Sequence, residues 1–361
     1  WFAHTMQLIY AGRNILRDAT PLPLSNQANM IFRSDGGRID LRPPNFGIYI
    51  LARSTNRAKA IFVMAYITGA SLVGVYSCYM LFRYGLHIGW LGAFLTSAAF
   101  MASVGWWMLS HTQARTSAAL TPYTVVGFIG LALGFWSLGQ GEADAALAFG
   151  LAAAGLAGFL IYLRWYSYFG REPSVALTVG QTLPEFDLED GEGGSVSSKS
   201  FQGKPALYLF YRGNWCPLCM AQIKEIAGQY QELAERGVAV VLISPQPHAH
   251  SRKLARRHDV PFHFLIDAGN RVAENLGIAA PGGLPAGMEV LGYDSDTVLP
   301  TVVITDAQGI IIFADQTDNY RVRPEPATFL AVLLAPRHLI TPAFPSTPAS
   351  SHPPSPPRPP P

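Results

Sequence analysis

Four long apolar runs fill the first half of the chain and limit what it can fold into. They cover Ala60–Phe82, Leu86–Leu109, Pro122–Gly139 and Ala145–Tyr168. About 20 residues at 1.5 Å each cross the ~30 Å hydrocarbon core of a bilayer, so each run has spanning length. Soluble domains are about 25% charged, whereas this chain is 14% charged. We therefore predict an α-helical transmembrane region of about four helices over residues 60–169, in preference to a very apolar soluble bundle.

Basic residues are distributed unevenly around these runs. Those before the first run, in the second loop and after the fourth run are Arg42, Arg53, Arg57, Lys59, Arg115, Arg164 and Arg171. The first loop holds Arg83 alone, and the third loop holds only acids, Glu142 and Asp144. Loops rich in Lys and Arg stay in the cytoplasm. Four spans therefore predict a multi-pass protein of the cell (inner) membrane with both ends of the chain in the cytoplasm.

The two ends of the chain differ from the rest in composition. Residues 1–59 hold eight Lys or Arg and three Asp without sustained periodicity, which indicates a basic irregular segment. Residues 341–361 include ten prolines. Such a tail has too few apolar residues to bury a core, so we predict that it is disordered.

From about Val175 the composition becomes that of a soluble α/β domain, which we place at residues 175–338. Apolar runs typical of strands are Ala206–Tyr211, Val238–Ser244, Phe262–Asp267, Thr301–Asp306 and Ile310–Ala314. Segments with helical patterning are Ala221–Arg236, His250–His258, Asn270–Leu276 and Pro326–Leu334. Strands and helices that alternate, followed by two strands around Ala307–Gly309, predict a central sheet that ends in a hairpin.

A Cys-X-X-Cys pair, Cys216 and Cys219, stands between the first of these strands and the first helix. Unpaired N–H groups and the helix dipole favour negative charge at a helix start. A thiolate there has a lowered pKa and is a usable nucleophile. We therefore predict that Cys216 attacks, with Pro217 in the first helical turn. Cys219, three residues on and on the same helix face, resolves the product as a disulfide.

Two simpler interpretations of the pair are an unreactive buried dithiol and a zinc site. Zinc needs four ligands, and His248 and His250 in a Pro-containing loop are the nearest candidates, so we expect no metal and no cofactor. The third cysteine, Cys78, stands alone in an apolar run. Because a dithiol relay across the membrane needs a pair within the spans, we predict that this chain does not carry electrons across the bilayer by itself.

Several further segments carry a resemblance to a known family. They are Val179–Phe186, Phe210–Cys219, Leu299–Thr301, Asp306–Gly309 and Asn319–Pro324. With them, residues 175–335 resemble the thioredoxin-like redoxins, in particular the alkyl-hydroperoxide-reductase/thiol-specific-antioxidant (peroxiredoxin-like) branch. The resemblance implies an α/β thioredoxin-fold domain in which Pro300 matches the cis-proline that faces the cysteine pair. The chain departs from typical peroxiredoxins at Gly213, where their loop places a Thr.

Three arginines are further candidates for the site. Arg212 is a candidate to hold the thiolate by charge, with an ordinary surface arginine as the alternative. By the resemblance, Arg321 or Arg323 approaches the site from the far strand end, where it would lower the thiol pKa and bind a peroxide oxygen. The alternative for these two is salt bridges with the nearby acids Asp315, Asp318 and Glu325.

These observations predict a membrane-anchored thiol-disulfide oxidoreductase that uses the Cys-X-X-Cys pair, with the redoxin domain in the cytoplasm. Its partners would be a protein or small-molecule disulfide, or a hydroperoxide, together with an external thiol donor and the lipid bilayer. A peroxiredoxin-like thiol peroxidase, acting as an antioxidant, is the near alternative. A non-enzymatic redox sensor or docking protein is the alternative from another class. The net charge of +2 gives no reason to expect nucleic acid.

Overall fold

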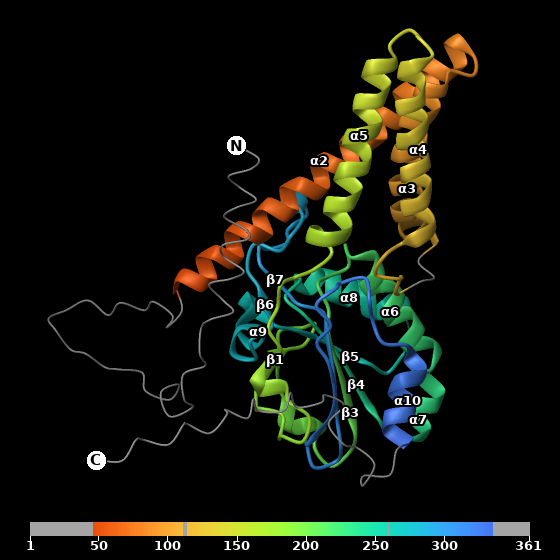
Figure 1. Ribbon diagram of the computed structural model, residues 1–361. Helices are drawn as coiled ribbons and strands as arrows, with labels where there is room; N and C mark the ends of the chain where they lie inside the picture. The colour runs from red at the N-terminus through yellow and green to blue at the C-terminus, as the bar shows by residue number, and fades with distance from the viewer. Residues whose placement is uncertain (1–45, 111–113, 259, 335–361) are drawn as a thin grey trace, which may run out of the picture. The chain divides into compact units, whose positions relative to one another are not determined.

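The computed structural model of the protein describes residues 46–110, 114–258 and 260–334. Within them, four long apolar helices precede a domain built on a seven-stranded mixed sheet (Figure 1). This confirms the predicted fold class, a helical region followed by a thioredoxin-like α/β domain. The Pro-rich tail and residues 1–45 lie outside the described residues.

The apolar helices follow the predicted runs closely. They are α2 (Phe46–Tyr84), α3 (Ile88–Ser110), α4 (Thr121–Gly139) and α5 (Ala145–Ile161), which continues as the π-helical turn η2 (Tyr162–Tyr166). All four are long and apolar enough to cross a membrane. The prediction of irregular structure for 1–59 is wrong for its last part, because α2 begins at Phe46. Polar side chains of this extension form hydrogen bonds with the α/β domain, as described below. These contacts stabilise the additional helical turns.

Small residues let the helices pack closely. A Cβ atom on Gly92 of α3 would overlap the backbone of Gly130 and Gly134 of α4, so these two helices touch backbone to backbone. Such close approach is typical of helices that associate in lipid. At the far end of the bundle, Glu142 accepts hydrogen bonds from the N–H groups of Ile88 and Gly89 at 3.2 and 3.1 Å. This carboxylate satisfies two unpaired donors at the start of α3.

The sheet has the strand order β2-β1-β5-β4-β3-β8-β9. The strands are β1 (Asp187–Glu189), β2 (Ser195–Ser197), β3 (Ala206–Phe210), β4 (Ala239–Ser244), β5 (His263–Ile266), β8 (Thr301–Thr305) and β9 (Ile311–Asp315). Strands β3, β4 and β5 are parallel, and β8 and β9 are antiparallel. The five predicted strands are confirmed. The short hairpin β1–β2 and the two-residue strands β6 (Ala279–Ala280) and β7 (Thr297–Val298) are too short to leave a periodic signal.

Helices cover both faces of the sheet. One face packs against α6 (Pro217–Gly228), α7 (Tyr230–Glu235), α8 (His248–His258) and α10 (Pro326–Leu334). The other face packs against α9 (Arg271–Asn275) and the segment that leads into the domain. The helix predicted over 221–236 is two helices, because Gln229 leaves the helical conformation directly after Gly228.

Candidate dithiol site

Cys216 lies at the start of α6, where β3 has ended and the helix begins. It is the N-cap residue, and its Sγ accepts a hydrogen bond from the N–H of Cys219 at 3.4 Å. Pro217 occupies the first helical position, where a missing N–H costs nothing. Both cysteines are free thiols; Cys216 is 3% exposed and Cys219 is fully buried. The predicted placement of the pair at a helix start is confirmed.

A buried glutamine that the sequence analysis missed holds the loop before Cys216. Gln246 accepts from the N–H of Asn214 at 2.9 Å. Its amide donates to the Tyr211 hydroxyl at 2.9 Å and to Ser251 Oγ at 3.0 Å. Gln246 follows β4, which runs parallel to β3, so its position two residues after that strand was the available signal.

Gly213 explains the departure from the peroxiredoxin pattern. Its φ of 142° is one that residues with a side chain rarely adopt, and a Cβ atom there would lie 2.8 Å from Trp215 Nε1. The Trp215 indole thus fills the space that a side chain at position 213 would take. A threonine at 213 is incompatible with this position of Trp215.

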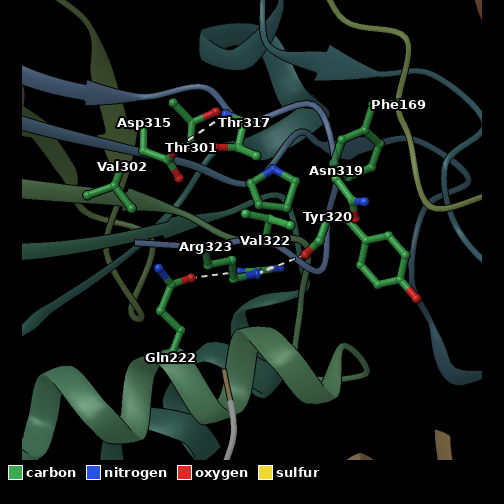
Figure 2. A pocket seen from close by; sticks show the side chains of 11 residues that line it. Phe169, Gln222, Thr301, Val302, Asp315, Thr317, Asn319, Tyr320, Val322 and Arg323 are labelled. Atoms are coloured by element: carbon green, nitrogen blue, oxygen red, sulfur yellow. Dashed lines mark hydrogen bonds between the residues drawn. The ribbon is translucent and has the colours of Figure 1, made fainter. Parts of the chain in front are cut away.

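Arg323 is the cation that reaches the dithiol. Its Nη2 donates to Cys219 Sγ at 3.5 Å, and its Nη1 donates to Gln222 Oε1 at 2.6 Å. Its Nε donates to the Tyr320 carbonyl at 3.1 Å, and the side chain is buried. Gln222 lies one turn after Cys219 on α6, a spacing that brings both to the same helix face. Figure 2 shows Gln222 and Tyr320 on either side of the Arg323 guanidinium.

This arrangement places the negative charge of the pair on Cys219 rather than on Cys216. Burial opposes a thiolate at Cys219, but the hydrogen bond from Cys216 and the charge of Arg323 outweigh it and lower the pKa of Cys219 to about 5. Burial, together with the hydrogen bond and charge of Cys219, raises the pKa of Cys216 above its usual range. The helix start alone predicts the opposite order. The difference arises because Arg323 contacts the second sulfur.

Arg321 lies elsewhere, and its predicted approach to the thiols is wrong. Its guanidinium is fully buried and donates to Ser167 Oγ at 2.9 Å and to Thr116 Oγ1 at 3.1 Å. It also donates to the carbonyls of Ser117 and Ala118 at 2.9 and 2.7 Å. Arg321 lies within a turn in which the Val322 N–H bonds the Asn319 carbonyl, whereas Arg323 follows that turn, so their side chains point in different directions. Among the described residues, neither arginine forms an ion pair with Asp315, Asp318 or Glu325.

Pro300 lies beside the site, but not as the resemblance implies. The described residues contain no cis peptide bond, so the bond before Pro300 is trans. Pro300 lines a pocket together with Gln222 and Arg323, which are labelled in Figure 2. Its carbonyl accepts from Arg171 Nη1 at 3.1 Å, and the N–H of Leu299 bonds the Ile278 carbonyl at 2.8 Å. The backbone around Pro300 is therefore already paired and presents no free edge to an extended peptide.

Arg212 is a buried residue of the loop before Cys216 rather than a surface arginine. Its guanidinium lies 4.6 Å from the centre of the Trp215 ring and donates to the Gly283 carbonyl at 2.5 Å. Its own carbonyl accepts from Thr297 Oγ1 at 2.9 Å. The charge of Arg212 partly offsets the factors that raise the pKa of Cys216.

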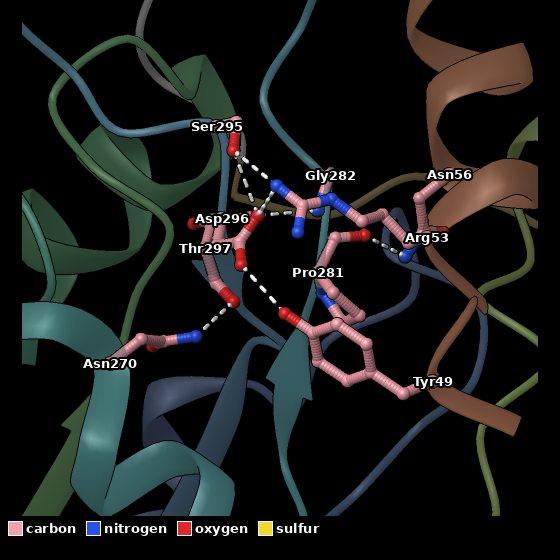
Figure 3. Close-up of polar contacts among 9 residues, drawn as sticks. All are labelled: Tyr49, Arg53, Asn56, Asn270, Pro281, Gly282, Ser295, Asp296 and Thr297. Carbon is pink, nitrogen blue, oxygen red and sulfur yellow. Dashed lines mark hydrogen bonds and ion pairs between the residues drawn. The ribbon is translucent and has the colours of Figure 1, made fainter. Parts of the chain in front are cut away.

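The first turns of α2 hold the loop that supports Arg212 (Figure 3). Tyr49 Oη donates to Asp296 Oδ2 at 3.1 Å, and Arg53 donates to Ser295 Oγ at 3.3 Å. Asn56 donates to the Pro281 carbonyl at 2.9 Å. These contacts explain why the basic extension of α2 is helical. The part of α2 that precedes the predicted membrane region thus contacts Asp296, and the next residue, Thr297, bonds the Arg212 carbonyl in the loop before Cys216.

Comparisons with known proteins find relatives of the α/β domain. Residues 179–314 match the AhpC/TSA family. The chloroplastic peroxiredoxin Q of Sedum lineare is 34% identical over 128 residues, which are 35% of this chain and 68% of that protein. The chloroplastic peroxiredoxin Q of Populus jackii is 32% identical and covers 29% of this chain and 51% of that protein.

Two further similarities come from bacteria. The thiol-disulfide oxidoreductase ResA of Bacillus cereus is 26% identical over 36% of this chain and 71% of its own length. The solved structure of peroxidoxin BcpB from Mycobacterium tuberculosis is 20% identical, with a TM-score of 0.35 over 44% of this chain and 96% of that one. The chain spans about half the length of several of the peroxiredoxin Q relatives.

Proposed function

Since the chain belongs to the AhpC/TSA family and its α/β domain is a redox-thiol domain, we propose that it is a membrane-anchored thiol peroxidase. One observation carries the proposal. The dithiol of Cys216 and Cys219 is buried at the start of α6, with Arg323 hydrogen-bonded to Cys219. The pair therefore holds a thiolate at neutral pH in a site too enclosed for a protein substrate.

The proposed reaction begins with proton exchange within the pair. The proton of Cys216 moves to the Cys219 thiolate along their hydrogen bond. The Cys216 thiolate then attacks the terminal oxygen of a hydroperoxide. The O–O bond breaks, the terminal OH stays on Cys216 as a sulfenic acid, and the alkoxide leaves as an alcohol after taking the proton from Cys219. The Cys219 thiolate attacks the sulfenic acid to form the Cys216–Cys219 disulfide, and the hydroxide leaves as water with a proton from solvent. An external dithiol reduces the disulfide by exchange.

Burial favours a hydroperoxide over a protein disulfide as the oxidant. Direct attack on a disulfide needs an in-line approach of three sulfurs, and Cys216 is only 3% exposed. The paired backbone at Pro300 also gives an extended peptide no strand edge to join. The sequence alone slightly favours disulfide exchange. The enclosure of Cys216 is the reason for reversing that order here.

Disulfide exchange with a small disulfide is the second candidate. The Cys-X-X-Cys spacing suits it, and ResA, a relative, is named a thiol-disulfide oxidoreductase. A non-enzymatic redox sensor would show reversible oxidation of Cys216 without turnover.

Full-length protein in detergent micelles, given dithiothreitol, tests these functions in one assay. We expect consumption of an organic hydroperoxide to exceed reduction of insulin disulfides. Cys216→Ser should abolish both, whereas Cys219→Ser should allow one turnover and then stall at the sulfenic acid. Full activity of Cys216→Ser would refute the mechanism. The matched control, Cys78→Ser, changes a cysteine distant from the site in sequence and should keep wild-type activity.

The membrane placement is a second part of the proposal. Four candidate spans, an even number, would put the α2 start and the α5 end on one side. That side carries the basic residues Arg53, Arg57, Arg115 and Arg171. Because basic loops stay in the cytoplasm, we place the redox domain there. Thiol labelling of intact cells with a membrane-impermeant reagent tests this placement. Labelling of Cys216 by a membrane-impermeant reagent without lysis would contradict it, with lysed cells as the positive control.

A further inference from the structure

A second pocket lies between α2 and the loop that carries Cys216. The residues that matter for its chemistry come from both parts of the chain: Lys59 of α2, Tyr166 at the end of η2, Phe169, Arg212 and Tyr320. The helical region and the redox domain therefore build one site together.

Two buried cations form the polar part of this pocket. Arg212 is 8% exposed and Lys59 is 9% exposed. Lys59 Nζ donates to the Tyr168 carbonyl at 2.5 Å and lies 5.7 Å from the centre of the Trp165 ring. Arg212 donates to the Gly283 carbonyl, but its buried Nε has no hydrogen-bond partner among the described residues. One donor of the guanidinium is thus left for a ligand.

These two charges lack a matching carboxylate. Among residues 46–110, 114–258 and 260–334, no Asp or Glu forms an ion pair with Lys59 or Arg212. The acid whose charge reaches Lys59 is Asp318, and its carboxylate already accepts from the N–H of Arg171 at 2.9 Å. Buried charges without partners are costly, and an arginine with free donors suits a carboxylate or phosphate.

The pocket also lies close to the reacting sulfur. Arg212 stacks on Trp215, the residue directly before Cys216, and its charge acts on the Cys216 thiol. Tyr166 is near enough to Cys216 for their charges to interact. A ligand whose anionic end binds Arg212 and Lys59 therefore brings its neighbouring atoms toward Cys216. Arg323 donates to Cys219 Sγ and takes no part in this pocket, so it continues to stabilise the thiolate when a ligand is bound.

We propose that this pocket binds the anionic group, a carboxylate or a phosphate, of the substrate that Cys216 reduces. The inference rests on the proposed peroxidase function for the reaction and on the pocket for the substrate class. The anionic group stays unchanged while the O–O bond of the same molecule takes two electrons from the dithiol and becomes an alcohol and water.

The anion has two possible sources, an amphiphile of the bilayer or a soluble molecule. In the membrane placement proposed above, Tyr166 ends the fourth candidate span and Lys59 directly precedes the apolar run predicted over 60–82. Both therefore lie near the interface, where headgroups and aromatic anchors meet. Met64, one turn after the pocket residue Ala60 on α2, is 40% exposed. An acyl chain has apolar surface to follow there, and a short soluble anion does not need it.

The first experiment measures binding without turnover. Cys216→Ser full-length protein in phosphatidylcholine nanodiscs is titrated with oleate and with oleyl alcohol. We expect oleate to bind about tenfold more tightly, a difference worth one favourable charged contact. Lys59→Gln should remove this preference and Lys59→Arg should keep it. Arg57→Gln, which removes an exposed charge two residues away, is the matched control and should also keep it.

The second experiment measures turnover of the wild type. The rate with linoleic acid hydroperoxide is divided by the rate with its methyl ester, so each protein supplies its own reference. A ratio of about ten that falls toward one in Lys59→Gln supports the proposal. A short soluble carboxylated hydroperoxide with the same ratio also supports an anion site and assigns a soluble source. If the short hydroperoxide shows no such ratio and the long-chain one does, the anion comes from an amphiphile of the bilayer.

The two experiments separate the two proposals. Preferential oleate binding with no turnover of any hydroperoxide would refute the peroxidase function and leave the anion pocket standing. Equal binding of oleate and the alcohol, with equal turnover of acid and ester, would overturn the anion pocket and leave the peroxidase function intact.

Discussion

Arg321 and Arg323 stand two residues apart and belong to two regions of the molecule with opposite tasks. The docking region is Arg321 with its partners Thr116, Ser117 and Ala118, from the loop before α4, and Ser167, which directly follows η2. The dithiol region is Arg323 with Cys219 and Gln222. In the docking region the guanidinium meets neutral oxygens and fixes structure. In the dithiol region it meets a sulfur and stabilises a charge. A buried arginine therefore fixes the structure where its acceptors are neutral, and it lowers a pKa where its acceptor can lose a proton.

The largest effect should come from Arg321→Met, which breaks the docking region. The change removes the donors of four buried hydrogen bonds and leaves their acceptors unpaired. Leaving buried acceptors unsatisfied costs about 2–4 kcal/mol in total. Thermal unfolding of the full-length protein in micelles should show the loss, while the titration of the thiols stays unchanged. A changed thiol titration with unchanged stability would reverse the assignment of the two arginines.

The sequence could not have separated these two arginines. In a regular strand, residues two apart point to the same side, so both were equal candidates for the site. The turn at Asn319–Val322 decides between them, and no local pattern announces it. By contrast, the four long apolar helices and the Cys216–Cys219 pair at a helix start were predictable, because length, hydropathy and spacing are local properties.

The charge on Cys219 was also beyond the sequence, for the same physical reason. A helix start favours a thiolate on its first residue, which indicated Cys216. The contact from Arg323, 104 positions along the chain, moves the lowest pKa to Cys219. Long-range contacts of this kind depend on how β9 and the segment after it pack on α6. The anion pocket needs the same kind of information, since Lys59 and Arg212 meet only in the folded chain.

A smaller effect, on chemistry instead of stability, should follow from Arg323→Met in the dithiol region. The pKa of Cys219 is about 5 in the wild type, so its thiolate absorbance should rise through that pH and level off at neutrality. Without the arginine we expect the pKa to rise by about 1–2 units, since a charged hydrogen bond is lost. The thiolate is then lost at pH 5–6 but kept above pH 9.

The ultraviolet absorbance of the thiolate measures this titration without any need for access to the buried sulfur. Arg321→Met is the matched control, because it removes the same charge two residues away. A midpoint that stays near its wild-type value in Arg323→Met would show that the helix start alone lowers the pKa of the pair. A midpoint that shifts equally in both variants would show that the two regions are not separate.

The smallest effect should come from Glu225→Gln, which tests whether the two regions communicate through α6. Glu225 pairs with Arg115 and accepts from the N–H of Ala114 at 3.4 Å, so it ties the redox helix to the loop between α3 and α4. Both partners are partly exposed, at 26% and 22%. Such pairs contribute at most about 1 kcal/mol, and salt weakens them.

For Glu225→Gln we expect a small decrease in thermal stability and no change in the thiol titration. Glu232→Gln, which breaks the exposed pair with Arg236 inside α7, is the control for loss of one surface ion pair. Glu225→Gln could instead shift the thiol pKa as far as Arg323→Met does. Contacts between the helical region and α6 would then set the acidity of the dithiol as well as the position of α6.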